Sequence, residues 1–301
     1  MHRAAPRRPC GNRASATRAC AAVVSAAAAA LRGSTWRGLA VWSEPVVSFG
    51  ERFQGHKVPA GLRYCPDFVS AEEQAELLQV LDGGATNLFL GRRTWTRNIR
   101  RAQQFFGLIY YQTSQAVPEL QPTAHSPLSS QYGRSMAELP AWLLPRLLSE
   151  GLFAAPGERG VNQVQGNEYL EDSGIGTHVE DPAAGPTLAT VSLLQPVQLT
   201  LQRAEQGKPM HRDRRDREDC LKVLLEPRSL LVLQGESRYD FAHSIRESKR
   251  VPLRDGSVLR RGPDYRRVSL TFRGIVEGQR STSRTDSPDG GAAYRVVIPP
   301  E

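Results

Sequence analysis

Two histidines and one glutamate are spaced so that they could bind a single metal ion. His178 and Glu180 are separated by one residue, and His243 lies much further along the chain. Residues i and i+2 of a β-strand point to the same face, so a strand would present His178 and Glu180 together. His243 would then come from a distant strand. Two imidazoles and one carboxylate are the set that holds non-heme Fe(II) on one side and leaves its other positions open.

Two arginines later in the chain could hold an acidic ligand beside that metal. Arg267 and Arg273 lie six residues apart in an expected strand over 265–273, and therefore on one face of it. A guanidinium binds a carboxylate through two parallel, charge-assisted hydrogen bonds. The pair predicts an acidic co-substrate that serves the activation of oxygen. For Arg273 the alternative is a salt bridge at the edge of the core.

The elements that must position these residues begin with helices. Ser70 and Glu73 have the spacing of a capping box, which predicts a helix over 71–81. A second helix is expected over 140–153, with Pro145 in its first turn or at a kink. Four of its side chains are expected to face the core, namely Trp142, Leu143, Leu147 and Leu148.

The pattern changes after residue 161 to short apolar runs divided by turns. Such runs predict strands. They cover residues 163–170, 187–194, 197–202, 221–225, 229–234 and 265–273. Helices followed by strands predict an α+β, mainly β domain in which the helices pack on one side of an antiparallel β-structure. We expect this single domain to cover residues 44–276.

Both ends of the 301-residue chain differ from that domain in composition. Residues 1–43 contain seven arginines and no acid, which is typical of a transit peptide, and we favour a mitochondrial one over a plastid one. A disordered tail is the alternative, and the protein would then be cytoplasmic or nuclear. Without these seven arginines, 32 basic residues face 31 acidic ones, so the net charge of +8 mostly describes the N-terminus. Residues 277–301 are rich in Ser, Gly, Pro and Asp, and we expect them to be disordered.

Cysteine usage and hydropathy argue against a zinc-cluster protein, a disulfide-rich protein and a membrane-spanning protein. The four cysteines form no C-x-x-C pair, so the sequence predicts neither a zinc cluster nor a disulfide framework. No apolar run approaches the roughly 20 residues that span a bilayer. We therefore expect no membrane partner, and we expect a monomer.

Three segments together resemble the AlkB family of 2-oxoglutarate-dependent dioxygenases. They are Asn162–His178, with the sequence NQVQGNEYLEDSGIGTH, then Gln234–His243, QGESRYDFAH, and Tyr265–Arg273, YRRVSLTFR. Their order and spacing match the family over roughly residues 60–275. The resemblance is greatest to the branch of tRNA wobble-uridine hydroxylases, with only the oxygenase domain present.

The resemblance implies a fold, a metal and a co-substrate. The fold would be a double-stranded β-helix, the jelly roll of the cupins. The metal would be Fe(II), with His178, Glu180 and His243 as its ligands. 2-Oxoglutarate and O2 would be the co-substrates. Four residues match positions that bind 2-oxoglutarate: Asn167, Tyr169, Arg267 at the distal carboxylate and Arg273 near the metal-proximal one.

The chain departs from the family pattern at two positions. Glu180 replaces the usual aspartate, which moves the carboxylate outward by roughly one carbon–carbon bond, about 1.5 Å. Ser244 replaces the usual glycine after the second histidine. The longer ligand leaves open a second interpretation, in which the protein is an AlkB-like binding module with weakened turnover.

Substrate choice would depend on the segment before this core. Residues 92–101 carry five arginines and no acid. We expect Arg97, Arg100 and Arg101 to contact phosphates and Phe106 to stack on an exposed base. The alternative is a solvated basic loop beside a core strand. The sequence thus predicts hydroxylation or oxidative demethylation of a modified base in nucleic acid, RNA ahead of DNA, and a protein substrate remains an alternative.

Overall fold

The computed structural model describes residues 39–53, 55–83, 95–97, 101–108, 133–155, 158, 160–204 and 219–275. Most of the expected leader and the whole expected C-terminal tail lie outside these ranges, as do Arg100 and the side chain of Arg97. No helix in the described ranges is long and apolar enough to cross a membrane.

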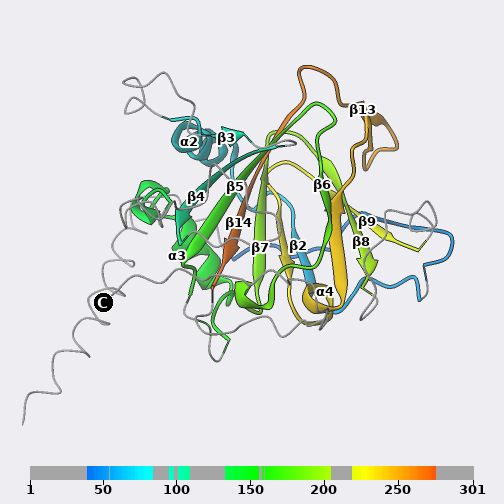
Figure 1. Ribbon diagram of the computed structural model, residues 1–301, viewed down its shortest axis with the longest axis horizontal. Coiled ribbons are helices and arrows are strands. Elements are labelled where there is room, and N and C mark those ends of the chain that lie inside the picture. The colour runs from blue at the N-terminus through cyan, green and yellow to red at the C-terminus, as the bar shows by residue number, and fades with distance from the viewer. Residues whose placement is uncertain are drawn as a thin grey trace, which may run out of the picture.

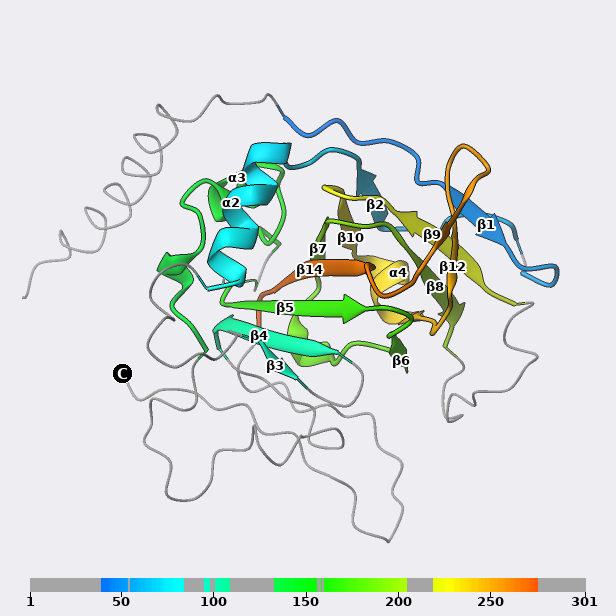
Figure 2. The ribbon, with the colours of Figure 1, turned by 90° about the horizontal axis from the view of Figure 1, so that it is seen from above.

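Two antiparallel sheets face each other in the described part of the chain (Figure 1, Figure 2). The larger sheet has seven strands in the order β2-β10-β7-β14-β5-β4-β3. Their bounds are Leu62–Cys65 (β2), Leu230–Leu233 (β10), Leu188–Leu193 (β7), Arg266–Arg273 (β14), Gln163–Leu170 (β5), Ala102–Gly107 (β4) and Thr96–Arg97 (β3). The smaller sheet has five strands in the order β1-β9-β8-β11-β6. Their bounds are Val47–Phe49 (β1), Leu221–Leu225 (β9), Val197–Arg203 (β8), Phe241–Ile245 (β11) and Ile175–His178 (β6).

Consecutive strands of the chain often belong to different sheets, which is the arrangement of a jelly roll. The chain passes from β5 to β6 and from β10 to β11 by crossing between the sheets. All pairings in both sheets are antiparallel. The predicted fold class is therefore confirmed.

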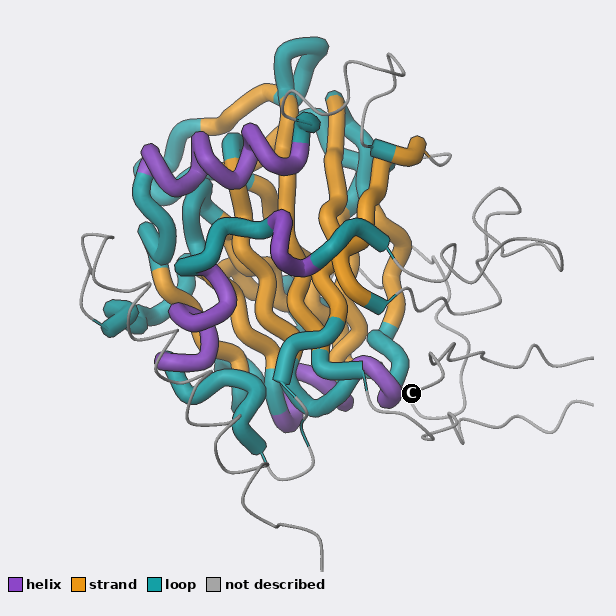
Figure 3. Tube along the Cα trace, turned by 90° about the vertical axis from the view of Figure 1, so that its left-hand side faces the viewer, coloured by secondary structure: helices purple, strands orange, loops and turns teal. Residues whose placement is uncertain are grey.

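Helices cover the outer face of the larger sheet (Figure 3). They are α2 (Ala71–Leu81), the short 3-10 helix η5 (Met136–Glu138) and α3 (Leu143–Ser149). Helix α2 has the predicted bounds, and its capping box is formed by Ser70 and Glu73. The predicted packing of helices on one side of the β-structure is confirmed.

The second helix is shorter than predicted. Helix α3 begins at Leu143 and keeps Pro145 in its first turn, where a missing N–H costs nothing. Leu143 and Leu147 are buried as expected. Leu148 is 48% exposed, so its prediction as a core residue was wrong. Successive residues lie about 100° apart around a helix, so Leu148 points away from the core when Leu147 points into it.

The two faces of β14 pack against different layers. Val268, Leu270 and Phe272 join the apolar core beneath the helices. The alternate residues, which include Arg267 and Arg273, therefore face the smaller sheet, because successive side chains of a strand point to opposite sides. We call this side of the larger sheet its inner face. A second apolar core, which includes Tyr169, lies between the sheets.

Two short helices lie in the connections between the two sheets. The 3-10 helix η6 (Pro182–Ala184) follows β6, and helix α4 (Gly235–Tyr239) leads into β11. After β11 comes a separate hairpin of β12 (Arg250–Pro252) and β13 (Val258–Arg260), which projects beyond the two sheets (Figure 1).

Candidate metal centre

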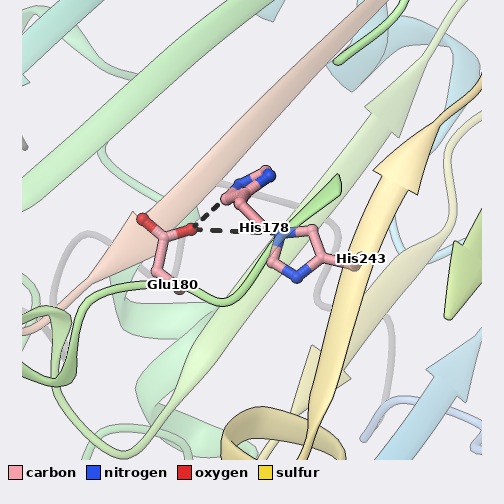
Figure 4. A group of neighbouring side chains, drawn as sticks. All are labelled: His178, Glu180 and His243. Carbon is pink, nitrogen blue, oxygen red and sulfur yellow. Dashed lines mark ion pairs between the residues drawn. The ribbon is translucent and has the colours of Figure 1, made fainter. Parts of the chain in front are cut away.

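The structure brings His178, Glu180 and His243 together. One potential ligand atom from each lies within 4.8 Å of the others. The Nε2 atoms of both histidines are 4.0 Å from Oε2 of Glu180, and the two rings are 4.4 Å apart between centroids (Figure 4). All three side chains are mostly buried, with 16 to 24% of each exposed. This cluster has the composition that the sequence predicted.

The two histidines lie opposite each other on neighbouring strands. His178 ends β6 and pairs in register with His243 of β11. The Nδ1 atom of His178 lies 2.8 Å from the carbonyl oxygen of Gly176. A carbonyl can only accept a hydrogen bond, so Nδ1 carries the proton and Nε2 keeps its lone pair toward Glu180. The imidazole is therefore oriented as a metal ligand.

Glu180 does not lie in the strand that carries His178. Strand β6 ends at His178, so the prediction of a shared strand was wrong. The carboxylate is instead held by Arg273, whose Nη2 is 2.9 Å from Oε1 of Glu180. The Nη1 atom of Arg273 donates to Gln163 at 3.0 Å and to Gln165 at 2.7 Å. The larger sheet thus supplies a fixed cation that turns Oε2 toward the histidines.

Electrostatics keep Glu180 and His243 in the protonation states that metal binding requires. Burial would raise the pKa of Glu180, but the charges of Arg273, His178 and His243 outweigh it and lower this pKa to about 2. Burial, with repulsion from His178, lowers the pKa of His243 to about 3. Near pH 7 Glu180 is therefore an anion and His243 a neutral imidazole, as metal ligands must be.

Arg267 is a buried cation with unused donors. Its side chain is 1% exposed, and Nη2 donates to Oγ of Ser192 at 3.0 Å. Its Nε and Nη1 are buried and have no hydrogen-bond partner among the described residues. The ring of Tyr169 lies 5.1 Å from the guanidinium. A buried, half-paired guanidinium fits an anionic ligand, because its free donors would otherwise be left unsatisfied.

Asn167 connects the inner face to the segment expected to meet the substrate. Its Oδ1 accepts hydrogen bonds from Nε of Arg101 and Nε2 of Gln103, both at 3.1 Å. Arg101 is only partly buried and immediately precedes β4. Asn167 and Tyr169 both project from the inner face of β5, where Tyr169 lies opposite Arg267 and Asn167 lies opposite Ser269.

Phe106 does not have the position that base stacking requires. Its ring is 0% exposed in the core beneath the helices, with the guanidinium of Arg134 at 4.8 Å. The prediction that Phe106 stacks on a base was therefore wrong. Alternation along β4 directs the preceding residue, Phe105, to the inner face opposite Gln165. A register error of one residue moves a side chain to the other face of a sheet.

Arg238 was missed by the sequence analysis, although it lies within one of the three resembling segments. It projects from α4, is 1% exposed, and donates to the main-chain oxygens of Glu180 and Asp181. A single arginine five residues before His243 was the available signal, but an arginine in an isolated segment does not reveal whether it will be buried.

A family model described as the 2OG-Fe(II) oxygenase superfamily matches residues 61–273, which include every residue of this site. The chain belongs to that superfamily. Fe(II) and 2-oxoglutarate, with O2, are the cofactor and co-substrates of the 2OG-Fe(II) oxygenases, and the His-Glu-His cluster fits the iron.

The chain is also similar to three proteins named as AlkB homologues. The "Alkylated DNA repair protein ALKBH8 homolog" of Arabidopsis thaliana is 27% identical over 71% of this chain and 58% of its own length. The "Probable RNA/DNA demethylase ALKBH6" of Danio rerio is 26% identical over 65% of this chain and 74% of its own. The mitochondrial "alkB homolog 7" of Bos taurus, an alpha-ketoglutarate-dependent dioxygenase, is 32% identical over 41% of this chain and 50% of its own. The chain therefore spans only about half of two of these relatives.

Proposed function

We propose that this oxygenase hydroxylates or oxidatively demethylates a modified base in nucleic acid, with RNA favoured over DNA. The observation that carries the enzymatic part is the convergence of three ligand side chains beside a buried arginine with unused donors. When bound, Fe(II), 2-oxoglutarate and O2 supply oxidation of a substrate C–H bond, coupled to conversion of 2-oxoglutarate to succinate and carbon dioxide.

The protein's own residues would bind and orient these partners. His178, Glu180 and His243 would hold Fe(II), and Arg267 would pair with the distal carboxylate of 2-oxoglutarate. Arg273 fixes the carboxylate of Glu180 and would lie near the other end of the co-substrate. The backbone of Glu180 lies beyond the end of β6, which would allow the longer side chain to be accommodated. This arrangement supports the enzyme over the binding module with weakened turnover.

Basic side chains on the β12-β13 hairpin support a nucleic-acid substrate. Arg250 and Arg260 face each other across this hairpin, and both are exposed, as is the neighbouring Lys249. None of the three forms an ion pair with a described residue. Like charges directly opposite on a ladder repel each other, so an anion between them would be stabilising. Further phosphate contacts would come from an earlier part of the sequence, from Arg97, Arg100 and Arg101.

The names of the relatives also favour nucleic acid. They include an alkylated DNA repair protein homologue, a probable RNA/DNA demethylase and, in Mus musculus, a "tRNA (carboxymethyluridine(34)-5-O)-methyltransferase". For this chain we place RNA first because a base in single-stranded RNA already lies outside a duplex and can enter a pocket directly. A protein substrate is the second candidate.

Two measurements test the substrate class. Purified protein with Fe(II), ascorbate and labelled 2-oxoglutarate should form succinate in step with loss of a modified base when supplied with RNA. Mass spectrometry of RNA from cells with and without the protein should then identify that base. Succinate formation coupled only to a peptide or to DNA would contradict the RNA proposal.

The hairpin gives this proposal a matched structural test. The double variant Arg250→Ala/Arg260→Ala should weaken binding of an RNA oligonucleotide. The slope of log affinity against log salt concentration should become shallower by the amount expected for the loss of about one to two phosphate contacts. Arg228→Ala removes an arginine that pairs with Asp67 elsewhere on the surface and should leave RNA affinity unchanged. Equal RNA affinity in all three proteins would exclude the hairpin.

We further propose that the protein acts in mitochondria as a monomer. The seven arginines and absent acids of residues 1–43 support an import signal, and two relatives carry the word mitochondrial in their names. Import of the chain into isolated mitochondria with removal of its N-terminus would support this location, and light scattering would establish the oligomeric state.

A further inference from the structure

Glu180 is the metal ligand whose main chain is least constrained by the sheets. His178 and His243 pair with each other within the β6-β11 ladder. The ladder ends at His178, and Glu180 follows in an irregular segment that leads into η6. Another contact must therefore fix the backbone of Glu180 if its carboxylate is to meet the histidines.

Arg238 provides that contact through its entire guanidinium. Its Nη1 donates to the carbonyl oxygen of Glu180 at 2.8 Å, and its Nη2 donates to that of Asp181 at 2.6 Å. Its Nε donates to the carbonyl oxygen of Gly185 at 3.2 Å. All three acceptors belong to the segment that carries Glu180. The charge of Arg238 is 1% exposed and is held by carbonyl groups, without an ion pair to a described carboxylate.

The helix that carries Arg238 is itself anchored. Backbone N–H groups of Gln234 and Ser237 donate to the carbonyl oxygens of Gly61 and Ala60. The side-chain amide of Gln234 also donates to Oγ1 of Thr187 at 2.9 Å. Gly61 has a φ of +85°, and a Cβ there would lie 2.0 Å from the carbonyl oxygen of Gln234. The close approach that holds α4 therefore requires glycine at this position.

We propose that Arg238 is the positioning residue that sets Glu180 against the two histidines. Arg238 lies five residues before His243 in the same chain segment, so its side chain ties the segment carrying one ligand to the segment carrying another. Two arginines thus bind different parts of Glu180, since Arg273 binds its carboxylate and Arg238 binds its main-chain oxygen. This inference rests on the proposed metal assignment and goes beyond it.

The proposal distinguishes positioning from general stabilisation. Loss of a residue that supports a metal ligand weakens metal affinity about 10- to 100-fold. Loss of a merely structural arginine lowers stability and leaves the metal affinity of the folded protein unchanged. Arg146 is the matched control, because it is also largely buried and donates to a carbonyl, that of Phe68, in the helix layer far from the metal centre.

The test measures Co(II) binding by calorimetry and visible absorption, since Co(II) replaces Fe(II) without oxidising. Arg238→Met should bind Co(II) about 10- to 100-fold more weakly than the parent protein. Arg146→Met should bind it as the parent does. If Arg238→Met does not fold, Arg238→Lys carries the test, because lysine keeps the charge and stem but cannot reach three carbonyls with one ammonium.

The same substitution made in the Glu180→Ala protein distinguishes failure of the positioning role of Arg238 from failure of the metal assignment. Glu180→Ala alone should weaken Co(II) binding, and if it does not, the proposed metal centre is wrong. With Glu180 already absent, removing Arg238 should change Co(II) affinity by less than about twofold, since coupled residues are not additive. Equal losses from Arg238 substitution in both backgrounds, or parent-like affinity in Arg238→Met, would overturn the positioning role.

Discussion

The outer and inner faces of β14 differ although they alternate along one strand. On the outer face, Phe272 is buried among apolar side chains, and Arg266 pairs with Asp82 and Glu168. On the inner face, Arg267 is buried with two nitrogen atoms that have no hydrogen-bond partner among the described residues, and Arg273 holds Glu180. Adjacent arginines thus have opposite surroundings.

The difference separates residues that stabilise the fold from residues that bind ligands. A buried polar group without a partner lowers stability, so its retention on the inner face indicates a ligand that supplies the partner. The outer face satisfies its charges within the protein. Substitutions on the two faces should therefore affect different measurements.

The largest effect should come from the outer face. Phe272→Ala should lower the free energy of unfolding by about 3–5 kcal/mol, because it removes a fully buried ring beneath the helices. Urea unfolding followed by circular dichroism measures this change. Folded Phe272→Ala should bind 2-oxoglutarate as the parent does, and a loss of less than about 1 kcal/mol would contradict the packing described.

Arg267→Met should have the reverse effects. Affinity for 2-oxoglutarate should fall by about 2–5 kcal/mol, since the buried partner of its distal carboxylate is removed. The free energy of unfolding should stay the same or rise, because an apolar side chain of similar length replaces a charge with unsatisfied donors. Calorimetric titration with Fe(II) present measures the affinity. Unchanged affinity, or a large loss of stability, would remove Arg267 from the co-substrate site.

Arg273→Lys should weaken metal binding by about 1–3 kcal/mol, corresponding to the usual effect of altering a ligand's support. Lysine retains the charge beside Glu180 but cannot also hold both Gln163 and Gln165. Titration with Co(II) measures the change. If the variant binds Co(II) like the parent, the ion pair with Glu180 does not position the carboxylate.

Arg266→Met should have the smallest effect. Its guanidinium is about one-third exposed, so its ion pairs with Asp82 and Glu168 should contribute only about 1 kcal/mol or less. The loss should diminish at high salt, and affinities for Co(II) and 2-oxoglutarate should stay unchanged. A decrease in either affinity would show that the outer face contributes to the site.

Much of the fold was predictable because local patterns agree with the final structure. The capping box of Ser70 and Glu73 fixes the start of α2, and the strands 163–170 and 221–225 have the predicted bounds. The second helix was predicted to be too long because the apolar residues directly before and after α3 in the sequence continue the pattern of an amphipathic helix. Short elements such as β6 and α4 lack a periodic signal of useful length.

The residues that form the metal centre were predictable from the sequence, but the residues that hold them in position were less so. His178, Glu180 and His243 could be found from spacing and resemblance, and the structure brings them together. The role of Arg238 depends on where α4 packs, which sequence spacing does not contain. Phe106 illustrates a second limit, because a patch of arginines and aromatic rings does not specify which of two adjacent rings faces the core.

The most direct test of the proposed centre is formation of succinate from labelled 2-oxoglutarate by purified protein with Fe(II) and O2. The parent protein should form succinate, and Glu180→Ala and His243→Ala should each abolish it while remaining folded. Glu180→Asp provides a further comparison of ligand length at the same position. Full succinate formation in either alanine variant would contradict the assignment of the metal centre.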